Sequence, residues 1–131
     1  LERYVQQALT AYRKTRDTVR IFCDGEDVEL QPQQILYAEM SARKVCLHLQ
    51  GAERDLLYTT ATMADLADLL ENHGFVRTHK SILVNMEHIR DLQSTRLYLR
   101  DGTELPVSSH TASAVRKIYT QWRSAKKWVI G

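Results

Sequence analysis

The sequence has few of the residues on which common metal-binding and phosphate-binding motifs depend. It contains two cysteines, two prolines and five glycines among 131 residues. It has no C-x-x-C pair and no H-x-x-x-H or H-E-x-x-H spacing, so a zinc site would need ligands from distant segments. It also has no G-x-x-x-x-G-K-[ST], G-x-G-x-x-G or G-x-S-x-G motif. We therefore expect no metal, no cofactor and no enzymatic activity.

Long hydrophobic runs are missing as well. No stretch of 18 apolar residues occurs, and the first residues lack the basic patch and apolar segment of a signal peptide. We therefore expect no membrane span in this chain and a cytoplasmic location. The chain begins at Leu1 rather than at Met, so we expect a fragment of a longer protein. A hydrophobic content of 44% is enough for one domain with a real core.

Most of the chain alternates apolar and polar residues, which predicts β-strands. Asp24-Gly25 and Asp101-Gly102 lie between such runs and are typical hairpin turns. Cys23 and Cys46 each lie inside an apolar run, which favours buried and inert thiols, with a redox pair as the alternative. The predicted strands cover residues 19–23, 28–30, 35–40, 45–49, 55–59, 82–84, 86–92, 96–100 and 104–107.

Two segments have apolar residues at helical spacing. The first, residues 63–70, follows Thr62, which can cap a helix, and Gly74 stands where the helix should end. The second follows Ser108 or Ser109, either of which can cap it. Its positive charges suit the helix dipole without any ligand, and they come from Arg116, Lys117, Arg123, Lys126 and Lys127. We expect a mostly β fold of about ten short antiparallel strands in small packed sheets, with one mid-chain helix and a C-terminal helix.

The stretch from Phe75 to Ile89 combines a basic corner with a buried run. Arg77, His79 and Lys80 are followed at once by the apolar residues 82–84. A basic loop held between buried strands presents its side chains rigidly to a polyanion. The net charge of +2 is too small to indicate nucleic-acid binding, so the distribution of charge decides this question.

Three fragments in a fixed order carry a family resemblance. They are I-L-Y-A-E at residues 35–39, F-x-R-x-H-K-S-x-L-V-N at 75–85 and D-G-x-x-L-P-V-S at 101–108. Together they resemble the LytTR family of bacterial DNA-binding domains, over about residues 19–119. The resemblance implies sequence-specific binding of double-stranded DNA by loops inserted in the major groove. It also implies the effector domain of a bacterial transcriptional regulator, such as a response regulator of a two-component system.

The resemblance has consequences for partners and for domain organisation. It implies direct-repeat promoter sites, a homodimer on DNA and an upstream receiver or sensor domain. Residues 1–17 would then be a helical connector, residues 18–127 the DNA-binding domain and residues 128–131 a tail. A solvated helix end leading into a linker is the compatible and simpler interpretation of residues 1–17.

The family contacts DNA from three loops, which correspond to residues 41–44, 78–80 and 109–111. Matching residue by residue gives Arg43 or Lys44, then Lys80, then His110. The chain departs from the family at 41–44, where Gly-Asn-Tyr is frequent, and at Ser109, where many members have a basic residue. The full set of expected DNA contacts is Arg43, Lys44, Arg77, His79, Lys80, Ser81, Asn85, Ser109 and His110.

Structural roles are the alternative for part of this set. Arg77 and His79 can instead pair with Glu87 or with the backbone of the sheet. Lys80 can be a solvated charge, and Asn85 can form a turn. A second class of function also stays open, namely a protein-interaction module whose basic loops dock an acidic partner domain.

Overall fold

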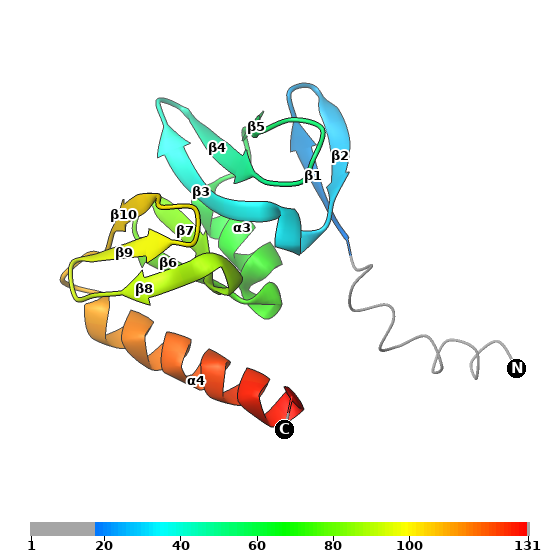
Figure 1. Cartoon of the computed structure of the whole chain (residues 1–131). Helices are drawn as coiled ribbons and strands as arrows, with labels where there is room; N and C mark the ends of the chain where they lie inside the picture. The colour runs from blue at the N-terminus through cyan, green and yellow to red at the C-terminus, as the bar shows by residue number, and fades with distance from the viewer. Residues whose placement is uncertain (1–17, 131) are drawn as a thin grey trace, which may run out of the picture.

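The computed structural model describes the backbone of residues 18–130 and the side chains of residues 18–125 (Figure 1). The described residues form ten strands in two sheets, with two α-helices, α3 and α4. The predicted mostly β architecture with a mid-chain and a C-terminal helix is therefore confirmed. The predicted connector at residues 1–17 lies outside the described residues.

The larger sheet has seven strands in the order β2-β1-β5-β4-β3-β7-β6, and all of its neighbouring strands are antiparallel. Hairpins connect β1 to β2, β3 to β4 and β6 to β7. The strands of this sheet are β1 (Val19–Cys23), β2 (Glu26–Leu30), β3 (Ile35–Ser41), β4 (Lys44–Leu49), β5 (Leu56–Thr59), β6 (Phe75–His79) and β7 (Ile82–Asn85).

The smaller sheet has three antiparallel strands in the order β10-β9-β8. Its strands and the two helices are β8 (Ile89–Leu92), β9 (Arg96–Leu99), β10 (Glu104–Pro106), α3 (Met63–Leu70) and α4 (Ala112–Ile130). Three single 3-10 turns connect elements, at η1 (Pro32–Gln34), η2 (Glu71–His73) and η3 (Met86–His88). Neither described helix has the length and apolar content needed to cross a membrane.

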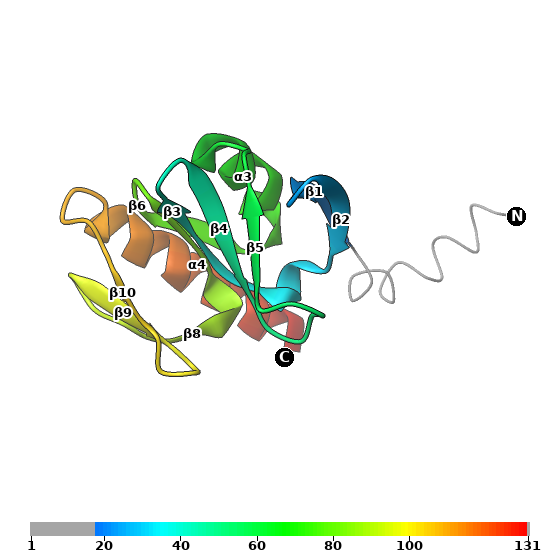
Figure 2. The same cartoon turned by 90° about the horizontal axis from the view of Figure 1, so that it is seen from above.

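The larger sheet separates two hydrophobic cores. Alternation along β3 places Ala38 in the core under α3 and Tyr37 in the core on the opposite face. The second core is closed by the smaller sheet and α4, through residues such as Leu97 and Val115. Figure 2 shows α3 on one side of β3, β4 and β5 and the smaller sheet on the other. Each fully buried leucine or valine contributes roughly 1.5–3 kcal/mol to folding.

Helix α3 begins where the sequence predicts and ends at Leu70, and the 3-10 turn η2 continues the chain to the predicted stop at Gly74. The Thr62 hydroxyl accepts a hydrogen bond from the Asp65 amide at 3.0 Å, which caps the first turn. After η2 the chain leaves the helical path at Gly74, whose φ is 87°. A Cβ at this position would lie only 2.9 Å from the indole nitrogen of Trp122. Gly74 is therefore required both by backbone conformation and by the close approach of α4.

Three predicted boundaries were wrong. The expected strand at 86–92 is divided into η3 and β8, because Asn85 caps a 3-10 turn before the chain extends again. Residues 75–79, expected to be a basic corner, form strand β6. Helix α4 begins at Ala112 and not directly after Ser108 or Ser109, because residues 108–111 form a separate turn. The helix continues to Ile130.

Both cysteines are free and buried, as the apolar runs predict. Burial raises the pKa of the Cys23 thiol to about 11, and burial also raises the pKa of Cys46. A thiol that is buried and protonated is a poor nucleophile and reacts slowly with oxidants. The two cysteines therefore behave as small core side chains.

Candidate nucleic-acid interface

Three polar turns meet at one end of the fold. They are the β3–β4 turn (Ala42–Arg43), the β6–β7 turn (Lys80–Ser81) and the pre-α4 turn (Ser108–Thr111). The Met40 amide donates to the Ser81 carbonyl at 2.9 Å, which joins the first turn to the second. The Ser108 amide donates to the Thr78 carbonyl at 2.8 Å, which joins the third turn to β6. The three expected contact loops are thus neighbours in space, on the side of the molecule that faces left in Figures 1 and 2.

Thr78 holds the pre-α4 turn in place. The β6–β7 register shifts between Arg77 and His79, so Thr78 lies in a bulge and does not pair with β7. Its carbonyl is free to accept from the Thr111 hydroxyl at 3.1 Å, in addition to the Ser108 amide. Its own hydroxyl is fully buried and donates to the Pro106 carbonyl at 3.2 Å. Sequence analysis placed Thr78 in an expected contact loop but missed this anchoring role, because the partners of Thr78 lie about thirty positions further along the chain.

The β3–β4 turn presents Arg43 and Lys44 to solvent. Both side chains are exposed, and neither forms an ion pair with any described carboxylate. Ala42 has a φ of 56°, which is the left-handed conformation that costs a non-glycine residue roughly 1–2 kcal/mol. The turn therefore accepts conformational strain while it exposes two positive charges that no described carboxylate pairs with.

The β6–β7 turn is closed by Arg77. One terminal nitrogen of its guanidinium donates to the Lys80 carbonyl at 2.6 Å, so Arg77 has the backbone partner that the alternative interpretation expected. Lys80 itself is exposed and makes no ion pair within the described residues. Arg77 therefore shapes the turn, while Lys80 projects from it.

His79 has an acceptor at Nδ1. The Ser81 amide, which can only donate, lies 3.2 Å from Nδ1, and the Ser81 hydroxyl lies 3.0 Å from the same atom. In the neutral ring this arrangement places the proton on Nε2. Half-buried His79 thus keeps one ring N–H for an external acceptor, and Ser81 holds the ring in position.

The pre-α4 turn carries Ser109 and His110, and both are exposed. The Ser108 hydroxyl accepts from the His110 amide at 3.2 Å, so this serine stabilises the turn and does not cap α4 directly. The exposed side chains of the turn offer hydrogen-bond donors of the kind that contact phosphates and base edges.

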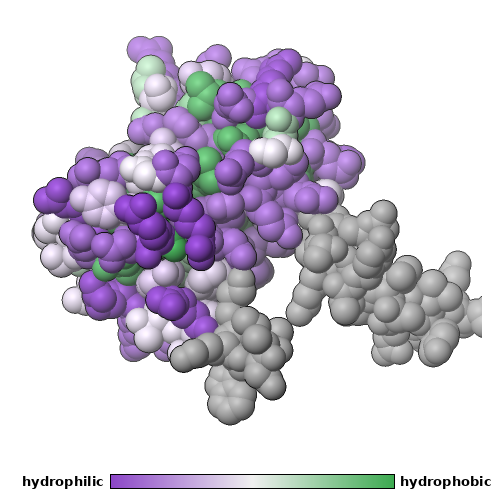
Figure 3. Space-filling model, in the orientation of Figure 1, coloured by the Kyte–Doolittle hydropathy of each residue, from purple (hydrophilic) through white to green (hydrophobic). Residues whose placement is uncertain are grey.

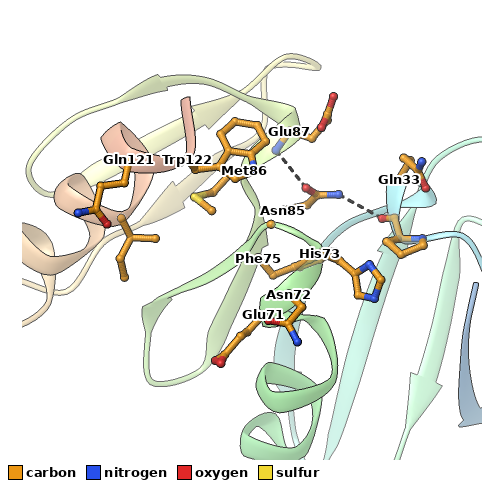
Figure 4. Close-up of a pocket in the computed structure, with 13 residues that line it drawn as sticks. Gln33, Glu71, Asn72, His73, Phe75, Asn85, Met86, Glu87, Gln121 and Trp122 are labelled. Atoms are coloured by element: carbon orange, nitrogen blue, oxygen red, sulfur yellow. Dashed lines mark hydrogen bonds between the residues drawn. The ribbon is translucent and has the colours of Figure 1, made fainter. Parts of the chain in front are cut away.

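Asn85 must be removed from the set of expected contacts. Only 2% of the residue is exposed, and its side chain is fully used inside the protein (Figure 4). Nδ2 donates to the carbonyls of Pro32 at 3.1 Å and Ile35 at 3.0 Å, and Oδ1 accepts from the Glu87 amide at 3.0 Å. A side chain whose donors and acceptor are all occupied in the core cannot reach DNA. The alternative prediction of a turn-forming role describes Asn85 correctly.

Comparison with known proteins gives the family. A family model for the LytTr DNA-binding domain matches residues 25–120. The sensory transduction protein LytT of Bacillus subtilis (strain 168) is 27% identical over an alignment 137 residues long, and this alignment covers 89% of this chain and 55% of that protein. The chain therefore spans about half the length of this relative.

A solved structure has the same fold. It is the LytTr DNA-binding domain of a putative methyl-accepting/DNA response regulator from Bacillus cereus, with a TM-score of 0.65 and 24% sequence identity. The match covers 77% of this chain and 94% of that structure. Because the family model also matches well over half of the residues, this chain belongs to the LytTR family of DNA-binding domains.

Proposed function

We propose that this domain recognises a specific sequence of double-stranded DNA by inserting the β3–β4, β6–β7 and pre-α4 turns into the major groove. It would act as the effector part of a bacterial transcriptional regulator, in a binding role without catalysis. The observation that carries the proposal is the convergence of the three turns, through the bonds from Met40 to Ser81 and from Ser108 to Thr78.

The three turns differ in what they can recognise. Arg43 and His110 carry planar donor groups, which suit the edges of bases in the major groove. Lys80 carries a compact charge on a flexible stem, which suits a phosphate group. The proposed contacts are Arg43, Lys44, Arg77, His79, Lys80, Ser81, Ser109 and His110.

The wider organisation is also proposed. We infer an upstream receiver or sensor domain, because about half of a relative named as a sensory transduction protein lies outside the match. Residues 1–17 would be the connector to that domain, and the protein would be cytoplasmic. Direct-repeat promoter sites and a homodimer on DNA are the expected arrangement.

Selection of binding sites from random duplexes tests the function directly, because it would return an enriched sequence. Binding of alanine variants is then measured by fluorescence anisotropy on the selected site and on random DNA. We expect Arg43→Ala and His110→Ala to cost about 1–3 kcal/mol on the selected site and little on random DNA. Lys80→Ala should weaken both alike and reduce the salt dependence by about one unit of slope.

Arg54→Ala is the matched control, because Arg54 is an exposed arginine that already pairs with Asp24 at 3.3 Å. It should leave both affinities unchanged. Failure to enrich any sequence, or unchanged binding in all three turn variants, would contradict the proposal. Binding of an acidic protein domain that depends on the same residues would then favour a protein-interaction module.

A further inference from the structure

A second basic surface lies between β8 and α4, outside the three turns. It is an open groove of about 610 Å³. Four arginines line it, and we name them the arginine groove: Arg90, Arg100, Arg116 and Arg123. Figure 3, drawn in the orientation of Figure 1, shows strongly hydrophilic surface over β8 and β9, next to the arginine groove.

Backbone carbonyls hold two of these side chains. A terminal nitrogen of Arg116 donates to the Leu92 carbonyl at 3.2 Å, which ties α4 to the end of β8. Nε of Arg100 donates to the Glu87 carbonyl at 3.3 Å. A carbonyl oxygen fixes the direction of a guanidinium group but does not neutralise its charge.

Aromatic rings hold the other two arginines of the groove. The guanidinium carbon of Arg90 lies 5.9 Å from the centre of the Tyr98 ring, and that of Arg123 lies 5.7 Å from the centre of the Tyr119 ring. Such contacts orient an arginine and also leave its positive charge in place.

Charge balance distinguishes the arginine groove from the surface around the ion-paired arginines Arg20, Arg54 and Arg96. None of its four arginines forms an ion pair with a carboxylate of the described residues, whereas Arg20, Arg54 and Arg96 each do. Glu87 and Asp91 also line the groove, so two carboxylates face four guanidinium groups. The Asp91 carboxylate accepts a hydrogen bond from Gln93 at 3.0 Å. The groove therefore has an excess of oriented positive charge.

The arginine groove follows the pre-α4 turn along helix α4. Helix α4 starts directly after the pre-α4 turn, and Arg116 lies in its second turn. Arg123 follows seven residues later on the same face, about 10 Å along the helix axis. Phosphates advance about 3.4 Å per step along each DNA strand, so this row spans roughly three steps.

We propose that the arginine groove binds backbone phosphates of the DNA that flanks the base pairs read by the turns. The inference rests on the proposed DNA-binding function and adds a second, sequence-independent contact surface to it. The position of the groove along α4, directly beyond the pre-α4 turn, favours DNA over an acidic protein as the occupant. Guanidinium groups also match phosphate oxygens in geometry as well as in charge.

Duplex length provides the test. Affinity is measured by fluorescence anisotropy on a duplex limited to the selected site and on one extended by about ten base pairs at each end. Since the flanking phosphates exist only on the long duplex, Arg116→Gln with Arg123→Gln should weaken binding there on the order of ten-fold. The salt dependence on the long duplex should fall by about two units of slope, with little change on the short one.

Two control variants distinguish the effect of lost positive charge from an effect on folding. Arg116→Lys with Arg123→Lys keeps the positive charge and should retain most of the affinity for the long duplex. Arg20→Gln with Arg54→Gln removes two arginines that already pair with carboxylates and should change neither duplex. The melting temperature of each variant shows whether loss of the Arg116 bond to Leu92 disturbs the fold.

An equal loss of affinity on both duplexes, or no loss on the long one, would overturn the proposal. If binding to polyglutamate instead depends on Arg116 and Arg123, the arginine groove is a surface for an acidic protein. Absence of any sequence preference in the unmodified domain would contradict base reading by the turns. The salt dependence of binding to random DNA would still test the phosphate contacts, because these do not depend on sequence, and the slope should fall by about two units in the Arg116→Gln, Arg123→Gln variant.

Discussion

The β1–β2 turn and the β3–β4 turn are both two-residue hairpin turns of the larger sheet, but they differ in backbone strain and in charge pairing. The β1–β2 turn is Asp24-Gly25, with φ values of 50° and 87°, and both residue types tolerate this conformation. The Asp24 carboxylate pairs with Arg54 at 3.3 Å. The β3–β4 turn instead places Ala42 at a φ of 56° and exposes Arg43, which pairs with no carboxylate in the part of the chain that the structure describes.

The difference separates turns that serve folding from turns that serve binding. In the β1–β2 turn the residues match the backbone, and the charged group has a partner within the protein. In the β3–β4 turn the backbone is strained and the charge has no described partner. Strain and unpaired charge reduce stability, so their presence in only one of the two turns supports a role in binding there.

A buried polar residue, Asn85 in the stretch from Phe75 to Ile89, gives the largest expected effect, because its side chain serves folding in the same way as the β1–β2 turn. Asn85→Ala removes three hydrogen bonds and leaves their backbone partners unsatisfied, which should cost about 3 kcal/mol of unfolding free energy. Urea denaturation measures this loss. At temperatures where the variant is folded, its preference for the selected DNA site should be unchanged.

Asn72→Ala is the control for Asn85, since Asn72 is exposed and lines the same pocket. It should change the unfolding free energy by no more than about 0.5 kcal/mol. A stable Asn85→Ala protein with reduced sequence preference would instead restore Asn85 as a DNA contact.

Replacement of the β3–β4 turn by the residues of the β1–β2 turn gives the next largest expected effect. Replacing Ala42-Arg43 with Asp-Gly through Ala42→Asp and Arg43→Gly should cost about 1–3 kcal/mol of binding on the selected site. The free energy of unfolding should stay the same or rise, because the new residues suit the hairpin. Anisotropy and urea denaturation measure the two effects on one sample. Unchanged affinity for the selected site would remove the β3–β4 turn from the interface.

Gly25→Ala tests whether the β1–β2 turn serves only folding. Gly25 has a φ of 87°, and a Cβ there would meet nothing within 4 Å, so the cost is purely conformational. We expect the unfolding free energy to fall by about 1 kcal/mol, with no change in DNA affinity. Glu26→Ala, at the exposed neighbouring position, provides the control in urea denaturation. A DNA-binding defect in Gly25→Ala would show that both turns contribute to the interface.

Ala42→Gly is the smallest expected change and has the opposite sign. Glycine relieves the left-handed strain but also makes the unfolded chain more flexible, so we expect a net gain of about 0.5 kcal/mol. Arg43 keeps its side chain, and the affinity for the selected site should therefore be retained. A clear loss of stability in thermal denaturation would mean that Ala42 is not strained.

Short-range patterns predicted most of the elements. The Asp24-Gly25 hairpin, the capped start of α3 at Thr62 and the left-handed stop at Gly74 after η2 were confirmed, because each depends on residues close together in the chain. The same local view failed for Asn85. An asparagine after an apolar run looks the same in the sequence in two cases: when it contacts DNA and when it donates to carbonyls about fifty residues away, as Asn85 does.

The amino-acid sequence by itself determined the mostly β fold, the hairpin turns and the family, because alternation, turn residues and the signature stretch are local properties of the chain. Only the tertiary structure decided which polar residues face solvent together. The β3–β7 pairing brings the β3–β4 and β6–β7 turns side by side, and the bulge at Thr78 frees a carbonyl that anchors the pre-α4 turn. The arginine groove likewise exists only because α4 packs beside β8. These arrangements depend on strand order and long-range hydrogen bonds, and residues that are distant in sequence carry no local signal of such contacts.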